Sequence, residues 1–160
     1  MDVAVYKGET MTVGSICSRV VATASSQETI RAAAQRMATN DVGTLVILEA
    51  TAVALPIGMV TDRDIVLRCV AAGLNPDRDR IDSIMTRPLH SVDEQAPVEE
   101  ATESMARAGT RRLAVVDRAG SLVGLLSMDD VLDLLADETG AIGRLLAKQH
   151  GQVPVAAGPH

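Results

Sequence analysis

The sequence predicts a mixed α/β fold made of two packed copies of one β-α-β-β-α unit, and three observations support this. First, residues 16–49 align with residues 84–117 at a constant offset of 68. Second, the match resumes at an offset of 66, where residues 58–64 (GMVTDRD) align with residues 124–130 (GLLSMDD). Third, each copy has a stretch of apolar residues at helical spacing between short continuous apolar runs. A unit of about 60 residues is marginally stable alone, so we expect the two copies to share a core.

The first copy is justified element by element from its apolar pattern. β-branched residues favour a short strand at the start, and apolar residues at helical spacing follow it up to Asn40. Two continuous apolar runs are typical of strands covered on both faces, and Gly73 ends the last helix. The predicted elements are a strand at 20–23, a helix at 30–40, strands at 45–48 and 56–60, and a helix at 62–72.

The second copy repeats this order. Pro97 suits the first helical position, and Gly109 ends that helix. The predicted elements are a helix at 98–108, strands at 113–116 and 122–126, and a closing helix at 128–136. A separate short helix is expected at 139–149, before a Gly/Pro/Ala-rich tail that we expect to be disordered. The predicted organisation is an arm at 1–11, repeat 1 at 12–73, a linker at 74–80, repeat 2 at 81–138 and a C-terminal part at 139–160.

Composition limits the classes of function. The net charge of −6 and the pI of about 5.0 argue against nucleic-acid binding, which needs basic surface. Tyr6 is the only aromatic residue, so aromatic stacking platforms are absent. No signal peptide and no apolar run long enough to span a membrane is found, so a cytoplasmic protein is expected. Cys17 and Cys69 lack any zinc spacing and are interpreted as small core residues, and no metal site is predicted.

One polar motif occurs at the same place in both repeats. It consists of Gly, two apolar residues, Ser or Thr, two further residues and Asp, and it joins a strand end to the first turn of a helix. The strand ends of open α/β sheets are where ligands bind, and a carboxylate near a helix start is electrostatically favoured. A carboxylate there can also accept two hydrogen bonds from a vicinal diol such as that of ribose. The motif residues are Gly58, Thr61 and Asp64 in repeat 1, and Gly124, Ser127 and Asp130 in repeat 2.

A purely structural interpretation of the motif remains open. Thr-x-x-Asp and Ser-x-x-Asp are also common capping boxes, in which the two side chains only satisfy the free amides of a helix start. The recurrence of the motif within a duplicated unit favours a ligand site over capping alone.

The chain resembles the CBS domain family, the regulatory repeats of the cystathionine β-synthase type. The resemblance rests on the two G-h-h-[ST]-x-x-D motifs and on residues 40–47 (NDVGTLVI) and 108–117 (AGTRRLAVVD), and it covers residues 12–137. The chain is similar to stand-alone bacterial members, because no catalytic, channel or transporter domain accompanies the repeats.

The resemblance implies that the two repeats pack through their sheets as a pseudo-twofold pair with two clefts. Each cleft would hold an adenosine-containing ligand such as AMP, ADP, ATP, NAD or S-adenosylmethionine, and no further cofactor is required. By the resemblance, Asp64 and Asp130 hold the ribose, and Thr61 and Ser127 lie near ribose and phosphate. The residue before the Asp often contacts phosphate. Arg63 fits that role, whereas Asp129 departs from the pattern.

The resemblance also assigns residues of the opposite repeat to each cleft. The base would contact Thr86, Arg87, Pro88, Leu89 and His90 in the Asp64 cleft, and Ser18, Arg19, Val20, Val21 and Ala22 in the Asp130 cleft. The start of the second strand would contribute Gly43 and Thr44 to the Asp64 cleft, and Arg111 and Arg112 to the Asp130 cleft.

These expectations favour a regulatory module that senses an adenosine-containing ligand and signals to an unidentified protein partner by a conformational change. The alternative is a dimerisation or interaction scaffold that binds no nucleotide. An enzyme is disfavoured, because no nucleophile–base pair or metal set is visible in the sequence. The alanine-rich helices predict close packing between copies and hence a homodimer, with no nucleic acid and no membrane among the partners.

Overall fold

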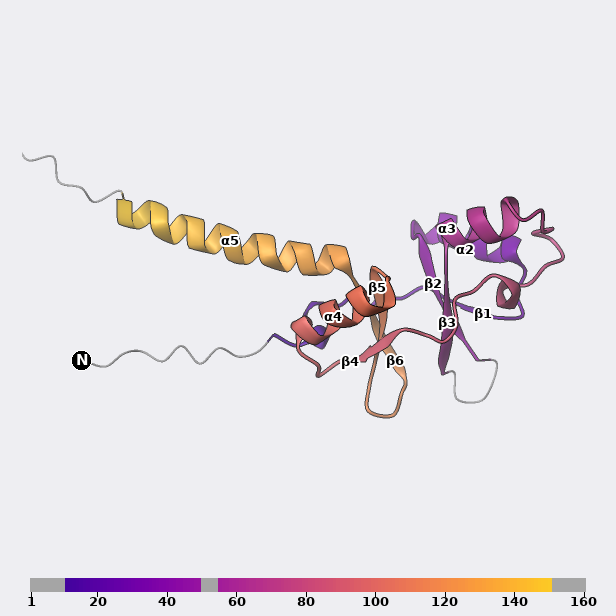
Figure 1. Ribbon diagram of the computed structural model, residues 1–160, viewed down its shortest axis with the longest axis horizontal. Coiled ribbons are helices and arrows are strands. Elements are labelled where there is room, and N and C mark those ends of the chain that lie inside the picture. Colours follow the sequence, from indigo (N-terminus) through magenta and orange to yellow (C-terminus); the bar gives the residue numbers. More distant parts are fainter. Residues whose placement is uncertain (1–10, 50–54, 151–160) are drawn as a thin grey trace, which may run out of the picture.

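The computed structural model describes residues 11–49 and 55–150, with the backbone alone for residues 138 and 141–150. Two three-stranded sheets face each other, each with helices on its outer side (Figure 1). The first half contains α1 (Val13–Ile16), β1 (Thr23–Ser25), α2 (Ile30–Asn40), β2 (Thr44–Leu48), β3 (Pro56–Thr61), α3 (Asp62–Asp64) and the π-helical η1 (Ile65–Val70). The second contains the 3₁₀ turn η2 (Ile81–Ser83), β4 (Ser91–Asp93), α4 (Val98–Ala108), β5 (Arg112–Val116), β6 (Leu122–Ser127) and α5 (Met128–His150).

Both sheets have the same topology, as expected from the duplication. β1 pairs with β2 in parallel and β2 pairs with β3 antiparallel, and β4, β5 and β6 repeat this arrangement. The helix between the first two strands provides the crossover that a parallel pair needs. The predicted α/β class with two β-α-β-β-α repeats is therefore confirmed.

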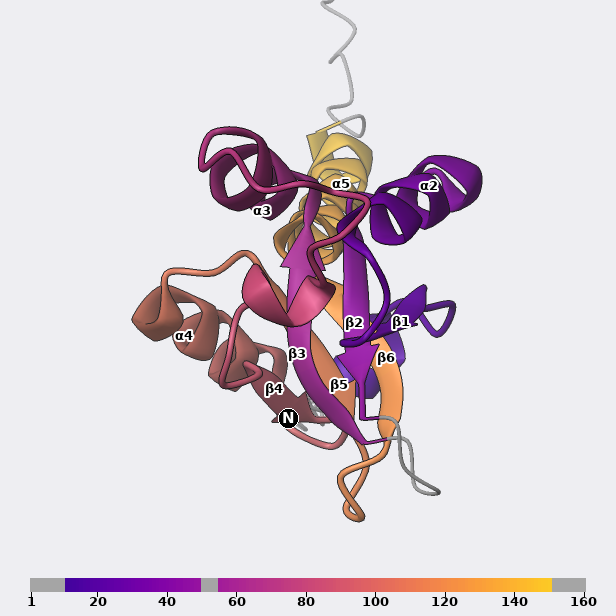
Figure 2. The same ribbon diagram turned by 90° about the vertical axis from the view of Figure 1, so that its right-hand side faces the viewer.

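The apolar core has three parts. One cluster lies under the helices of each repeat, and a third joins the two sheets through Val46, Met59 and Ala114. Figure 2 shows β2 and β3 lying in front of β5 and β6, so the third cluster is the contact between sheets. Because burial of an aliphatic side chain contributes about 1.5–3 kcal/mol, this shared face stabilises the pair beyond what either repeat has alone.

The segment that precedes each repeat crosses to the other repeat. Val13 of α1 is buried in the core of repeat 2, and Ile81 of η2 is buried in the core of repeat 1. After these turns, Ser18 forms an isolated bridge with Leu125, and Thr86 forms one with Met59. Each half is thus completed by the chain that leads into its partner, and the two repeats are interlocked.

Two predictions on the C-terminal part need comment. The sequence predicts separate helices at 128–136 and 139–149, but α5 is one continuous helix (Figure 1). No proline interrupts it, and the Thr139 hydroxyl donates to the carbonyl of Leu135 at 2.7 Å, which is a contact within a regular helix. The expectations for arm residues 1–10 and tail residues 151–160 lie outside the described residues. Among the helices that are described, none is both long and apolar enough to cross a membrane.

Candidate functional site

The two motifs adopt the same local geometry at the ends of β3 and β6. The amide and hydroxyl of Thr61 donate to Oδ2 of Asp64 at 2.9 and 2.8 Å, and the Asp64 amide donates back to Thr61 Oγ1 at 3.1 Å. Ser127 and Asp130 repeat this exchange at 2.7, 2.7 and 3.2 Å. Both motifs are therefore capping boxes, as the structural interpretation predicts.

Capping does not use the full hydrogen-bonding capacity of Asp64. A carboxylate has about four acceptor positions, and the two bonds from Thr61 fall on the same oxygen, Oδ2. The other oxygen, Oδ1, lies 3.4 Å from Nε of Arg68, and the Asp64 side chain is 16% exposed. The carboxylate can thus stabilise the helix start and accept hydrogen bonds from a ligand at the same time.

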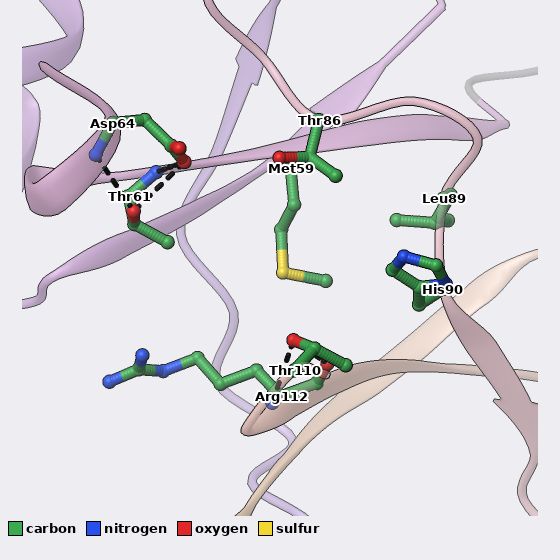
Figure 3. A pocket seen from close by; sticks show the side chains of 8 residues that line it. All are labelled: Met59, Thr61, Asp64, Thr86, Leu89, His90, Thr110 and Arg112. Atoms are coloured by element: carbon green, nitrogen blue, oxygen red, sulfur yellow. Dashed lines mark hydrogen bonds between the residues drawn. The ribbon is translucent and has the colours of Figure 1, made fainter. Parts of the chain in front are cut away.

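A pocket between the two repeats lies next to this carboxylate (Figure 3). It holds about 70 Å³, room for a few water molecules. The residues that line it come from β3, from the start of α3, from the segment before β4 and from the start of β5: Met59, Thr61, Asp64, Thr86, Leu89, His90, Thr110 and Arg112.

The structure brings together most residues that were assigned to the Asp64 cleft from the opposite repeat. Thr86, Leu89 and His90 line the pocket, whereas Arg87 and Pro88 of the same segment are exposed and lie outside the lining. The role of these residues in binding a ligand stays a prediction. Arg63 is exposed at the start of α3 and is also outside the lining.

Arg112 lines two pockets. With Arg111, Ser127 and Asp129 it borders a pocket on the Asp130 side, where the resemblance places it. It also lines the Asp64 pocket, with its side chain extended across from Thr61 and Asp64 (Figure 3). Arg112 starts β5 and pairs in register with Ser127. Its side chain is on the same strand face as that of Ala114, which packs between the sheets. That face points at repeat 1, so the arginine reaches the pocket of the other half.

Met59 and Thr110 line the pocket but were not singled out from the sequence. The Met59 side chain occupies the middle of the view in Figure 3, between Thr86 and Thr110. The Thr110 hydroxyl donates to the carbonyl of Arg112 at 3.1 Å and accepts from its amide at 3.3 Å, which fixes the turn before β5. Strand alternation identifies Met59, because it lies two residues before Thr61.

Thr44 and Gly43 lie at the start of β2 and do not line the Asp64 pocket to which they were assigned. Thr44 faces the opposite repeat with Val46, by strand alternation. Its hydroxyl is buried, and the described residues provide no hydrogen-bond partner for it. The carbonyl of Gly43 accepts from the amide of Asp62 at 3.1 Å.

The Asp130 half is built in the same way but with other side chains. Ser18 pairs with Leu125, and Val21 packs against the cluster between the sheets. Val20 is 91% exposed, and the carbonyl of Ala22 accepts from the amide of Val46.

In that half, Arg111 and Arg112 line a second pocket of about 120 Å³ together with Ser127, Met128 and Asp129. Arg19 donates to Glu94 at 3.1 Å and to the carbonyl of Gly14 at 2.9 Å. Arg111 and Asp129 form an exposed ion pair at 3.4 Å.

The remaining reactive groups do not suggest chemistry at this site. In residues 11–49 and 55–150, no group of three or more His, Cys, Asp or Glu side chains is placed to hold a metal ion. Burial raises the pKa of the Cys17 thiol, which lowers its reactivity. Cys69 is buried in the core of repeat 1.

The chain belongs to the CBS domain family, whose pattern matches residues 13–70 and residues 81–137. It is 37% identical over 124 residues to the uncharacterised protein MK0525 of Methanopyrus kandleri, and the match covers 78% of this chain and 62% of that protein. It is 35% identical over 111 residues to the CBS domain-containing protein YhcV of Bacillus subtilis, and the match covers 69% of this chain and 76% of that protein. It is 32% identical over 128 residues to hypoxic response protein 1 of Mycobacterium tuberculosis, covering 75% and 82%.

Solved structures show the same architecture. The CBS domain protein PAE2072 from Pyrobaculum aerophilum, complexed with AMP, superimposes with a TM-score of 0.69 at 32% identity, over 75% of this chain and 89% of that one. The CBS domain pair of protein MJ0100, in complex with 5′-methylthioadenosine and S-adenosyl-L-methionine, superimposes with a TM-score of 0.71 at 25% identity, over 80% of this chain and 98% of that one.

Proposed function

We propose that this protein is a regulatory module that binds an adenosine-containing ligand in the Asp64 pocket and signals its presence to a partner protein. The ligand classes in view are AMP, ADP, ATP and NAD. The proposal is supported by the similarity to a CBS protein complexed with AMP and to a CBS pair complexed with methylthioadenosine and S-adenosylmethionine. In this proposal the protein is a cytoplasmic sensor, not an enzyme, and binds neither nucleic acid nor membrane.

The observation that carries the proposal is that both repeats line one pocket. Asp64 and Met59 come from repeat 1, while His90 and Arg112 come from repeat 2. The pocket of about 70 Å³ is smaller than the roughly 300 Å³ of common ligand sites. A nucleotide therefore requires the Met59 side chain and the two repeats to shift. A ligand that binds only the opened arrangement biases the pair toward it, and this change is the proposed signal.

Calorimetric titration with AMP, ATP and NAD tests the proposal directly. We expect Asp64→Ala to lower the affinity for the nucleotide by roughly 30- to 100-fold, because it removes charge-assisted hydrogen bonds worth about 2–3 kcal/mol. Asp133→Ala is the matched control, since Asp133 is an exposed carboxylate on α5 outside the pocket. Unchanged affinity in both Asp64→Ala and Asp130→Ala would reject the assigned site. Mass spectrometry of small molecules released from freshly purified protein identifies the ligand.

A scaffold without a nucleotide is the second candidate. It is favoured by the capping boxes, which give Asp64 and Asp130 a structural role in the absence of any ligand. The scaffold predicts a stable dimer whose melting temperature no adenosine compound shifts. A shift with AMP that Asp64→Ala abolishes would reject the scaffold.

We also propose a homodimer, formed through the helices of repeat 1. The outer side of η1 exposes Val66, Leu67 and Val70 by 56%, 51% and 69%. Beside them, α2 and η1 border an apolar groove of about 360 Å³ that includes Ala34 and Ala38. Exposed apolar surface of this kind marks protein interfaces. Light scattering that gives a monomer mass at micromolar concentration would contradict the dimer.

A further inference from the structure

Arg68 connects two residues of the Asp64 pocket although it does not line the pocket itself. Its Nε lies 3.4 Å from Oδ1 of Asp64, and its Nη1 donates to the carbonyl of Ile84 at 2.9 Å and to Oγ1 of Thr86 at 3.4 Å. Asp64 lines the pocket from repeat 1, and Thr86 lines it from the segment that leads into repeat 2 (Figure 3). One guanidinium group therefore holds a pocket residue from each side.

A ligand on Asp64 would act directly on this arginine. The two bonds from Thr61 fall on Oδ2 of Asp64, so Oδ1 is the oxygen that the capping box leaves free. A ribose hydroxyl that donates to Oδ1 shares this oxygen with Arg68. The Arg68 side chain is 48% exposed, and exposed ion pairs are weak, so a bound ligand can displace the arginine from the carboxylate.

Arg68 lies in η1, whose backbone differs from that of the equivalent helix in repeat 2. The amide of Ala71 donates to the carbonyl of Val66, five residues earlier, at 2.9 Å, which is the π-helical pattern. At the offset of 66, η1 corresponds to residues 131–136, which are α-helical within α5. Arg68 corresponds there to Leu134, which packs against the core of repeat 2. The repeat fold therefore does not require the π-helix, and such turns often mark functional sites.

The same six residues carry the exposed apolar face of repeat 1. Val66, Leu67 and Val70 are exposed on η1, whereas Cys69 is buried in the core of the repeat. A change from π-helical to α-helical hydrogen bonds turns the later residues of a helix about its axis. Such a change would move Val70 relative to the core, and with it the surface that η1 offers to a partner.

We propose that Arg68 is a positioning residue that transmits occupancy of the Asp64 pocket to the exposed face of η1. Without a ligand, its bonds to Asp64 and to the crossing segment hold η1 in the π-helical form. A ligand that occupies Oδ1 releases Arg68 from Asp64, and η1 changes its hydrogen-bond pattern. The Asp130 half has Leu134 at this position and does not transmit in this way. This inference rests on the proposed function, because it requires a ligand on Asp64.

Hydrogen exchange measured by mass spectrometry tests the transmission without depending on a partner. AMP, ATP and NAD are the probes, and exchange is measured with each one that binds. In wild type, the nucleotide should change the exchange rate of residues 65–74 by roughly fivefold or more, the lower end of usual coupling between sites. In Arg68→Met, which keeps an unbranched stem without the charge, it should still protect residues 57–64 but leave residues 65–74 unchanged.

Arg78→Met is the matched control, because Arg78 is an exposed arginine of the linker outside η1 and the pocket. It should respond to the nucleotide as wild type does. Circular dichroism melting confirms folding, and Arg68→Lys replaces Arg68→Met if that protein does not fold. A lysine keeps the charge beside Asp64 but lacks the fork that reaches both Asp64 and Ile84, so the response of residues 65–74 should still fall.

Calorimetry on each protein separates binding from transmission. The affinity of Arg68→Met for the nucleotide should stay within about tenfold of wild type, since an exposed ion pair contributes little. An equal response of residues 65–74 in wild type and Arg68→Met would overturn the transmission and leave nucleotide binding intact, as would no response in a wild type that binds. Loss of binding in Arg68→Met would make Arg68 a binding residue and overturn its role in transmission. Failure of all three nucleotides to bind wild type would overturn both proposals.

Discussion

Gly58→Ala tests the interlocking of the repeats at the point where the motif glycine meets the crossing segment. A Cβ on Gly58 would lie 2.9 Å from the carbonyl oxygen of Thr86 and 3.1 Å from Sδ of Met85. That carbonyl accepts from the amide of Met59 at 3.3 Å, and the Thr86 amide donates to the Met59 carbonyl at 2.8 Å. Overpacking costs about 1–3 kcal/mol, and each weakened bond adds about 0.5–1.5 kcal/mol. We expect a total loss of about 2–6 kcal/mol in the free energy of unfolding.

Urea unfolding followed by circular dichroism measures this loss, since the chain has no tryptophan to report by fluorescence. Gly43→Ala is the matched control. Its Cβ would lie 3.0 Å from Oδ2 of Asp62, but that atom ends a side chain that can rotate away. We expect the control to change the free energy of unfolding by less than about 1 kcal/mol. A cost below about 0.5 kcal/mol for Gly58→Ala, or an equal cost for the two variants, would refute the close packing of the crossing segment.

Two further predictions concern pH and assembly. Burial raises the pKa of Glu28, but hydrogen bonds from Arg36 and the Ser25 amide and the charge of Arg36 outweigh it, so the pKa is lowered. The stabilisation is therefore present above the unfolded-state pKa of Glu28 and is lost as pH falls through the folded-state pKa. The difference in unfolding free energy between wild type and Glu28→Gln should shrink as pH falls below about 4. A difference that stays constant with pH would contradict this prediction. Val70→Asp should convert the proposed dimer to monomers, as measured by light scattering. The control Ala119→Asp, on the exposed turn between β5 and β6, should leave the mass unchanged. A dimeric Val70→Asp protein would place the interface elsewhere.

Local patterns predict the elements of this fold well because each carries its own signal. Gly109 ends α4, and the continuous apolar strands lie where the sequence predicts them. The helix predicted at 62–72 ends earlier, because η1 stops at Val70, three residues before Gly73. The path of the crossing segments is not encoded locally. Val13 and Ile81 are apolar residues that fit the core of either repeat, and only the packed structure shows that each is buried in the other one.

The site is only partly predictable for the same reason. The spacing of Thr61 and Asp64 predicts both the cap and the carboxylate at the pocket, and the resemblance to the CBS domain family predicts that Thr86 and His90 lie nearby. Arg112 lines the Asp64 pocket as well as the pocket beside Ser127, because its face of β5 packs against repeat 1, and an alignment of repeats does not contain this information. Helix α5 is longer than predicted because Asp137 and Glu138, which separate the two predicted helices, do not prevent helix continuation.

The central claim is that Asp64 binds the two ribose hydroxyls of a ligand held between the repeats. Titration of wild type and Asp64→Ala with AMP and with 2′-deoxy-AMP tests it as a double-mutant cycle. We predict that loss of the 2′-hydroxyl weakens binding to wild type by roughly tenfold or more, and has little further effect in Asp64→Ala. An equal loss in both proteins, or wild-type affinity for AMP in Asp64→Ala, would contradict it.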